Sequence, residues 1–160
     1  METELYRVIK LIDAKKLTSD DKEDLLKLFM ATNNSLIRNY IAFIFSDIQY
    51  DKAVPYIIKK INEKSTFNNN GSLVFALENF NLKKYFIPLI KVICEQEFEA
   101  RLMAYGIVQK YVVLVSEGVK NKVLKILEDH RMRLEKEAID KGENSTLHFI
   151  EKTKELLLPK

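Results

Sequence analysis

Two stretches of the chain share a pattern that places proline at the same point of each. Pro55 and Pro88 are 33 residues apart, and each follows an apolar run and a short polar connection. A fixed period of roughly 20 to 50 residues is typical of a unit that cannot bury its apolar side alone and stacks against copies of itself. The repeat therefore predicts a stack of similar units. The matching segments are 41–45 with 53–58, and 73–77 with 86–90.

Each unit is interpreted as two helices joined by a polar turn, which holds Asp47 in the first unit and Asn79 and Asn81 in the second. The proline marks the start of the second helix. The first helical turn does not need the backbone N–H that proline lacks, and the fixed φ of proline suits helix entry. A third and more degenerate copy begins at Glu99, and its second helix has no proline. We therefore expect about three helix pairs.

The first helices of two units carry an arginine that is followed by an alanine, namely Arg38 with Ala42 and Arg101 with Ala104. In the first unit, the segment 53–57 then reads Ala-Val-Pro-Tyr-Ile. This pattern resembles the short form of the HEAT repeat family, and the resemblance covers about residues 35 to 115. It implies a curved stack of antiparallel helix pairs that usually binds a macromolecule along one face.

The sequence departs from the HEAT pattern in two ways. Gly71 and Ser72 stand where the middle unit should have its arginine, and Tyr40 and Phe43 are bulkier than the residues typical of those positions. The alternative is an ordinary helical bundle in which two helices that begin with proline coincide by chance.

Length and composition favour a single domain over residues 1–160. A chain of 160 residues, of which 47% are hydrophobic, can bury a sizeable core. Its four glycines and three prolines are too few for the many turns of an all-β fold. We predict an all-α fold, an α-solenoid of about three HEAT-like helix pairs with capping helices at both ends.

The predicted capping helices rest on apolar spacing and on helix-start signals. Two helices precede the repeats, and Thr18 with Asp21 is typical of a capping box at the start of the second. After Ser116 a long polar helix is expected to run to about Ile139, and Ser145 opens a last helix. The charge-rich surface of these helices suits the ends of a stack, which must be solvated.

No group of residues has the pattern of a catalytic, metal or cofactor site. Cys94 follows Ile90 by four residues, so it should lie on the same buried face, whereas a nucleophilic cysteine needs exposure. Neither His130 nor His148 belongs to a metal-ligand spacing, and no glycine-rich phosphate loop is present in the sequence. We therefore expect a protein that is not an enzyme and that has no cofactor, no metal and no small-molecule ligand.

The sequence gives no sign of export or membrane insertion. The first residues are acidic, and no apolar run approaches the roughly 20 residues that span a bilayer. The single cysteine agrees with a reducing compartment. A cytoplasmic location without a membrane partner is the expectation.

Nucleic acid is the main alternative to a protein partner. The formal charge is +3 and the calculated pI is about 8.8, and some HEAT-like proteins resemble DNA-base glycosylases. However, the basic residues alternate with acids along each helix, which is typical of an ion-paired, solvated face. A groove that follows a phosphate backbone needs an uninterrupted positive stripe. We therefore rank this alternative below protein binding.

The second helices of the units are the expected contact surface, because they line one face of such a stack. Residues of 52–63 and 83–97 that the core does not need are left for a partner. Tyrosine is enriched at interface anchors and long charged side chains at the rim, although Tyr56 can equally cover the neighbouring unit. The candidate residues are Tyr56, Lys59, Lys60, Lys84, Lys91 and Glu95.

Our functional hypothesis is a non-enzymatic protein-binding module, with a bacterial immunity protein that blocks a toxin as its specific form. That form rests on a resemblance in size and style to helical immunity proteins. An adaptor subunit of a host complex is a second form. The positive net charge does not suit a basic toxin, but an acidic patch around Glu95, Glu97 and Glu99 does.

Overall fold

The computed structural model describes residues 3–137 and 142–158, which form nine α-helices and several single 3₁₀ turns, without a strand. The described part of the chain is therefore all-α, as predicted. The α-helices are α1 (Glu4–Lys10), α2 (Ser19–Ala31), α3 (Ser35–Asp47), α4 (Val54–Ile61), α5 (Gly71–Ala76), α6 (Phe86–Glu95), α7 (Phe98–Tyr111), α8 (Glu117–Lys136) and α9 (Thr146–Leu157). The 3₁₀ turns are Ala14–Lys16, Asp51–Ala53, Lys64–Thr66, Lys83–Tyr85 and Val112–Leu114.

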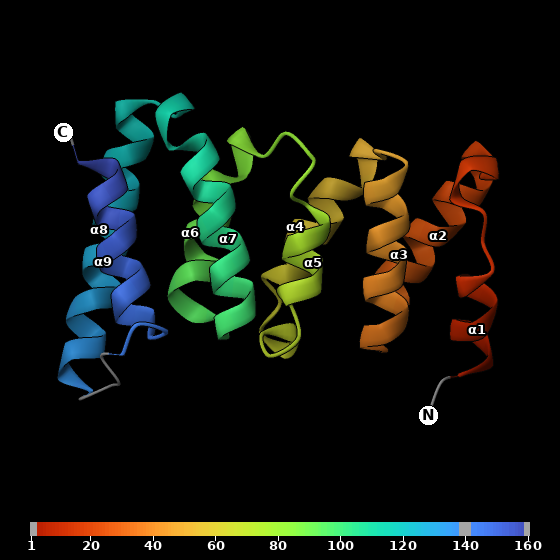
Figure 1. The fold of residues 1–160 in the computed structure, drawn as a ribbon, viewed down its shortest axis with the longest axis horizontal. Helices are drawn as coiled ribbons and strands as arrows, with labels where there is room; N and C mark the ends of the chain where they lie inside the picture. Colours follow the sequence, from red (N-terminus) through yellow and green to blue (C-terminus); the bar gives the residue numbers. More distant parts are fainter. Residues whose placement is uncertain (1–2, 138–141, 159–160) are drawn as a thin grey trace.

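The helices follow one another along a row in chain order, and the two ends of the chain lie at opposite ends of that row (Figure 1). The odd-numbered helices form a front layer, in which α1 contacts α3, α3 contacts α5, α5 contacts α7 and α7 contacts α9. The even-numbered helices lie behind them, and α6 contacts both α7 and α8. Each front helix is thus separated in sequence from the next by one rear helix.

Local signals in the sequence set the helix boundaries. The Thr18 side chain accepts from the Asp21 N–H, and the Asp21 carboxylate accepts from the Thr18 N–H at 2.8 Å, which is the predicted capping box. Ser116 caps α8 and Ser145 caps α9, and each side chain accepts from a backbone N–H in the first turn of its helix. Pro55 lies in the first turn of α4, as its missing N–H requires.

The hydrophobic core runs along the row between the two layers. The buried side chains come from every α-helix of the described part, and Phe29, Phe45 and Phe86 are among the largest that are fully buried. Cys94 is buried on α6, as its position relative to Ile90 predicted. Packing of these buried side chains stabilises helices of which most are too short to be stable alone in water.

A buried polar group joins the starts of two front helices. Asn70 precedes α5 and is fully buried, and its amide donates to the Gln96 side chain at 2.7 Å and to the Ile61 carbonyl at 2.9 Å. Gln96, which lies before α7, donates to the same carbonyl at 2.7 Å. The end of α4 and the starts of α5 and α7 are therefore held at one point.

Two predicted segments have different bounds in the structure. The first helix of the second unit begins at Gly71 and ends at Ala76, because Asn70 fixes its start and the chain then turns to bury Phe80 and Leu82. The long polar helix ends at Lys136, and its predicted last residues, up to Ile139, lie partly outside the described part of the chain. No helix in residues 3–137 and 142–158 is long and apolar enough to cross a membrane.

Candidate functional site

The predicted contact residues lie on α4, on α6 and in the 3₁₀ turn that precedes α6. Tyr56, Lys59, Lys84 and Lys91 are exposed, and Tyr56 retains 39% of its accessible surface. None of these three lysines has an ion-pair partner in the described part of the chain. The structure therefore leaves these four side chains available for a partner.

Two of the predicted residues already have partners within the chain. The Lys60 side chain is only 13% exposed, and its ammonium group lies 3.0 Å from Glu63 and donates to the Met30 carbonyl. Glu95 is exposed but lies 3.5 Å from the His130 ring on α8. Lys60 and Glu95 thus connect neighbouring elements of the fold.

A groove of about 800 Å³ lies between the starts of α4, α6 and α8. Lys84 contributes to it beside Lys83, and Pro55, Tyr85 and Leu114 supply apolar walls. The Lys84 ammonium group lies 5.1 Å from the centre of the Tyr85 ring. The groove therefore combines apolar walls with positive charge, which Asp51 partly offsets.

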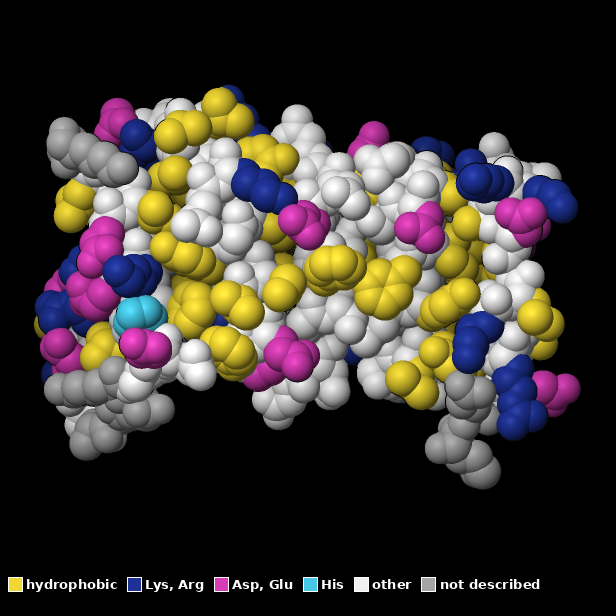
Figure 2. All heavy atoms as spheres, viewed as in Figure 1, with side chains coloured by type: hydrophobic (Ala, Val, Ile, Leu, Met, Phe, Trp, Pro, Cys, Tyr) yellow, Lys and Arg dark blue, Asp and Glu magenta, His cyan; other side chains and the backbone are white. Residues whose placement is uncertain are grey.

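The front layer carries an exposed apolar surface that the sequence prediction missed. Phe75 on α5 is 52% exposed, and Phe98 and Leu102 on α7 are 38% and 40% exposed. Together with Phe43 on α3, we call these residues the apolar row. Figure 2 shows hydrophobic side chains in a band across the middle of this face, over the front helices. Exposed aromatic side chains in one contiguous patch are typical of interaction surfaces.

Ring contacts join neighbouring helices at both ends of the apolar row. Phe43 and Phe75 meet edge to face, with 6.2 Å between the ring centres. At the other end, Phe98 lies 6.2 Å from Phe149 of α9, and Tyr105 lies 5.5 Å from the same ring. One ring contact thus joins α3 to α5 and two join α7 to α9, although the Phe149 ring itself is buried.

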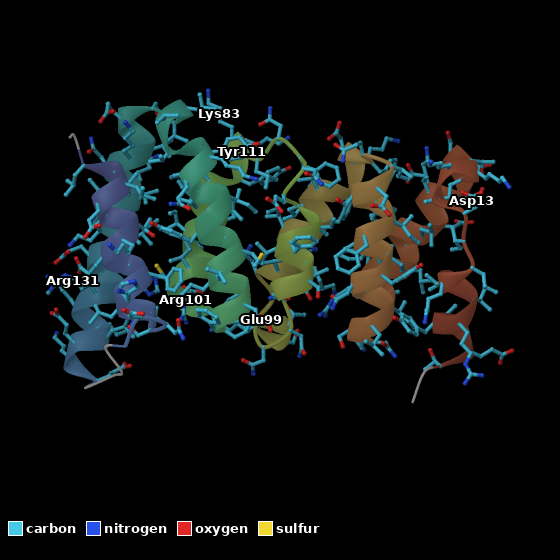
Figure 3. The ribbon with its side chains drawn as sticks, viewed as in Figure 1. Asp13, Lys83, Glu99, Arg101, Tyr111 and Arg131 are labelled. Carbon is cyan, nitrogen blue, oxygen red and sulfur yellow. The ribbon has the colours of Figure 1, made fainter. Side chains whose placement is uncertain are left out.

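Carboxylates border the apolar row on both sides. Asp47 follows Phe43 by one helical turn on α3, and Glu78 follows Phe75 just after α5. Glu97 and Glu99 flank Phe98 at the opposite border, where Glu99 lies at the start of α7 (Figure 3). Glu78 is paired with Lys110 at 2.8 Å, whereas Asp47, Glu97 and Glu99 have no ion pair among the described residues.

A hollow of about 470 Å³ lies at this second border, between the starts of α3, α5 and α7. Glu97 accepts from the Gly71 N–H at 3.1 Å through one oxygen, and its other oxygen is buried without a donor from the described chain. The Asn39 amide oxygen is in the same situation. The residues lining the hollow are Asn39, Asn68, Asn69, Gly71, Ser72, Glu97, Phe98 and Glu99. They offer acceptors rather than positive charge.

The sequence could not separate the apolar row from the core. In α3 the residues Ile41, Ala42, Ile44 and Phe45 are buried and Phe43 is not, although all five are apolar. A helix that is apolar on nearly all sides gives no periodic signal for its exposed side. Only the contacts of α3 with α1, α2 and α5 identify which side remains open.

Cys94 and His130 have pKa values that their surroundings shift. Burial raises the pKa of the Cys94 thiol to about 12, so the thiolate nucleophile is absent at neutral pH. Burial and the nearby charge of Arg133 lower the pKa of His130. Within residues 3–137 and 142–158, no three His, Cys, Asp or Glu side chains are grouped as a metal site would need.

Comparisons of this chain with protein-family models, with curated proteins and with solved structures find no match.

Proposed function

We propose that this chain is a HEAT-like α-solenoid that binds another protein and has no catalytic activity of its own. Three features support the proposal: the two-layer row of helices, the buried arginines at matching positions of α3 and α7, and the exposed apolar row. Elongated stacks of helix pairs present long surfaces to macromolecules. The function therefore follows from a surface rather than from a pocket.

The apolar row is the observation that carries this proposal. Complete burial of a fully exposed phenylalanine is worth roughly 1.5–3 kcal/mol. Because Phe75 and Phe98 are 52% and 38% exposed, covering the rest of each ring would contribute roughly half of that amount. The row also has the composition of an interface centre, with aromatic side chains inside and charged side chains around them. The predicted contacts on α4 and α6 belong instead to a more charged surface.

The proposal is tested by affinity purification of the tagged chain from its native host, with nucleic acid digested and bound proteins identified by mass spectrometry. The decisive comparison is between Phe75→Ser on the front layer and Tyr56→Ser on the rear layer. Both remove an exposed aromatic ring of similar size. We expect a stoichiometric protein partner that Phe75→Ser loses and Tyr56→Ser retains.

Two results would contradict this assignment. Loss of the partner in Tyr56→Ser alone would move the binding surface to α4 and α6, where the sequence placed it. Retention of the partner in both variants would show that binding needs neither of these exposed aromatic rings. Circular dichroism of each variant establishes that its helices are intact.

A toxin is the specific partner that we propose, which would make this chain an immunity protein. The acidic patch suggested for this role is divided in the structure, because Glu95 contacts His130 while Glu97 and Glu99 line the hollow beside Phe98. Co-expression with a toxin encoded beside this gene tests the proposal. Protection that Phe75→Ser abolishes supports it, whereas co-purification with a large host complex favours the adaptor alternative.

Nucleic acid binding is a second candidate because of the lysines on the rear layer. Lys59, Lys84 and Lys91 have no ion-pair partner in the described part of the chain, in contrast to Lys52 and Lys60. A DNA mobility shift that weakens steeply with salt, and that Lys59→Gln with Lys91→Gln abolishes, would support this reading. Binding unaffected by these substitutions would reject it.

A further inference from the structure

The charge around the apolar row is opposite in sign to that of the whole chain. The chain carries a formal charge of +3. At the borders of the row, however, Lys110 offsets only Glu78, and Asp47, Glu97 and Glu99 stay unpaired in the described part of the chain. The unpaired carboxylates lie at the end of α3 and at the start of α7. Figure 2 shows acidic side chains on both sides of the hydrophobic band.

We propose that the apolar row binds an amphipathic segment of a partner protein whose apolar side chains are flanked on both sides by lysine or arginine. This inference rests on the proposed function and adds the chemistry of the partner. Its basis is charge complementarity, because an acidic border attracts basic groups and rejects acidic ones. The apolar side chains cover Phe43, Phe75, Phe98 and Leu102.

The hollow beside Phe98 is the position for one basic side chain. Glu97 and Glu99 supply negative charge, and the Asn39 amide oxygen and the buried Glu97 oxygen are acceptors that lack donors from the described chain. A guanidinium group has several donors in one plane and no acceptor, so it matches such a set. The exposed ring of Phe98 can also contact the cation through its face.

The opposite border supplies a second, weaker contact. Asp47 is exposed at the end of α3 and has no ion pair in the described residues, so its carboxylate is free to meet a cation. It also lies at a helix C-terminus, where the helix dipole adds negative potential and favours a cation. A segment that crosses the row therefore meets negative charge at both of its edges.

The experiment uses the full chain and two synthetic amphipathic peptides of about 18 residues, or five turns of α-helix. Both peptides have the same leucine and phenylalanine face. One carries lysine and arginine at the flanking positions, and the other carries glutamate there. Fluorescence anisotropy measures the affinity of each peptide at about 50 mM and about 300 mM salt.

We expect the basic peptide to bind at least about tenfold more tightly than the acidic one, with an affinity that falls as salt rises. Asp47→Lys together with Glu99→Lys should weaken the basic peptide by about tenfold or more. The control is Asp129→Lys, which reverses an exposed acid on α8, in the rear layer, that has no ion pair among the described residues. Phe75→Ser should weaken both peptides.

Each other result overturns the inference. Equal binding of both peptides that Phe75→Ser abolishes would show an apolar site without charge preference, and it would leave the protein-binding proposal intact. Binding of the basic peptide that Phe75→Ser does not change would show attraction to charge alone. Binding of neither peptide would reject this partner chemistry, and purification from the host would then test the proposed function separately. Concentration-dependent dimers in sedimentation, lost in Phe75→Ser, would identify a second copy as the occupant.

Discussion

Arg38 and Arg101 hold the same position in two helices, and each donates to the equivalent backbone carbonyl ahead of the next front helix. Each is the fourth residue of its helix, α3 or α7, and each is buried. Arg38 donates to the Asn69 carbonyl at 3.2 Å and Arg101 to the Asn144 carbonyl at 2.7 Å. Each of these carbonyls belongs to the residue just before the N-cap of the next front helix, α5 or α9.

The two arginines differ in the number of hydrogen bonds that they make. Arg101 also donates to the carbonyls of Ile93 and Gln96, at 3.2 Å and 2.7 Å, whereas the Nε of Arg38 has no acceptor among the described residues. Hydrogen bonds from a charged group are worth about 1.5–3 kcal/mol each, partly offset by the cost of burying the charge. That cost also lowers the pKa of both guanidinium groups.

We therefore predict unequal losses of stability when each arginine becomes methionine. Arg101→Met should lower the free energy of unfolding by about 3 kcal/mol and Arg38→Met by about 1 kcal/mol. Urea denaturation followed by circular dichroism measures both. Arg101→Lys serves as a control that keeps the charge, and it should remain strongly destabilised because an ammonium group cannot reach three carbonyls in one plane. Equal losses for the two methionine variants would contradict this explanation.

The close approach of α5 to α7 leads to a second prediction. A Cβ atom on Gly71 would lie 2.9 Å from the Glu99 Cβ, which is fixed to the backbone and cannot move aside alone. Gly71→Ala should therefore lower the free energy of unfolding by about 1–3 kcal/mol. Gly106 is a matched control, since a Cβ there would meet no atom within 4 Å, and Gly106→Ala should be neutral or stabilise α7 by up to about 1 kcal/mol.

The sequence predicted much of the fold because its signals were local. Pro55, Thr18 with Asp21, and Ser145 each mark a helix start through the hydrogen bonds of a few neighbouring residues. The alignment of Arg101 with Arg38 was correct as a structural relation, because the two side chains perform the same task. The family assignment that this alignment suggested stays a prediction.

The candidate surface could not be read from the sequence because it depends on which helices are neighbours. Lys60 was expected to contact a partner, but its ammonium group lies beside Glu63 and the Met30 carbonyl. Met30 belongs to α2, 30 residues earlier in the sequence. Phe75 has the apolar character of a core residue, but in the structure its side chain is half exposed. The contact of Asn70 with Gln96 joins residues 26 positions apart, so no local pattern could predict it.

Cys94 provides a prediction about chemical reactivity. Its thiol is buried on α6, and burial raises its pKa to about 12, so the folded protein holds almost no thiolate at pH 8. A thiol reagent such as DTNB should react with the native chain only as fast as the chain opens, and at once after unfolding in urea. Arg101→Met should accelerate the native reaction because it raises the population of the open state. Rapid, stoichiometric labelling of the folded wild-type chain would contradict the buried position.

His130 gives the chain a defined dependence of stability on pH. Burial and the positive charge of Arg133 lower its pKa in the folded state, although Glu95 at 3.5 Å and Asp129 act in the opposite direction. Below the ordinary histidine pKa of about 6.5 the unfolded chain binds a proton that the folded chain resists, so stability should fall from about pH 6.5 down to the folded pKa. Each unit of difference between the two pKa values corresponds to about 1.4 kcal/mol. Glu128, whose pKa Arg131 and Lys154 lower to about 2, loses its contribution only as the pH falls below 4.5, the ordinary pKa of a glutamate, so measurements above pH 5 exclude it. Urea denaturation at about pH 7.5 and about pH 5.5 tests this dependence. The loss of stability at the lower pH should be smaller in His130→Gln than in the wild-type chain. The control His148→Gln keeps His130 and should retain the wild-type loss. The same loss in all three proteins would assign the pH dependence to other groups.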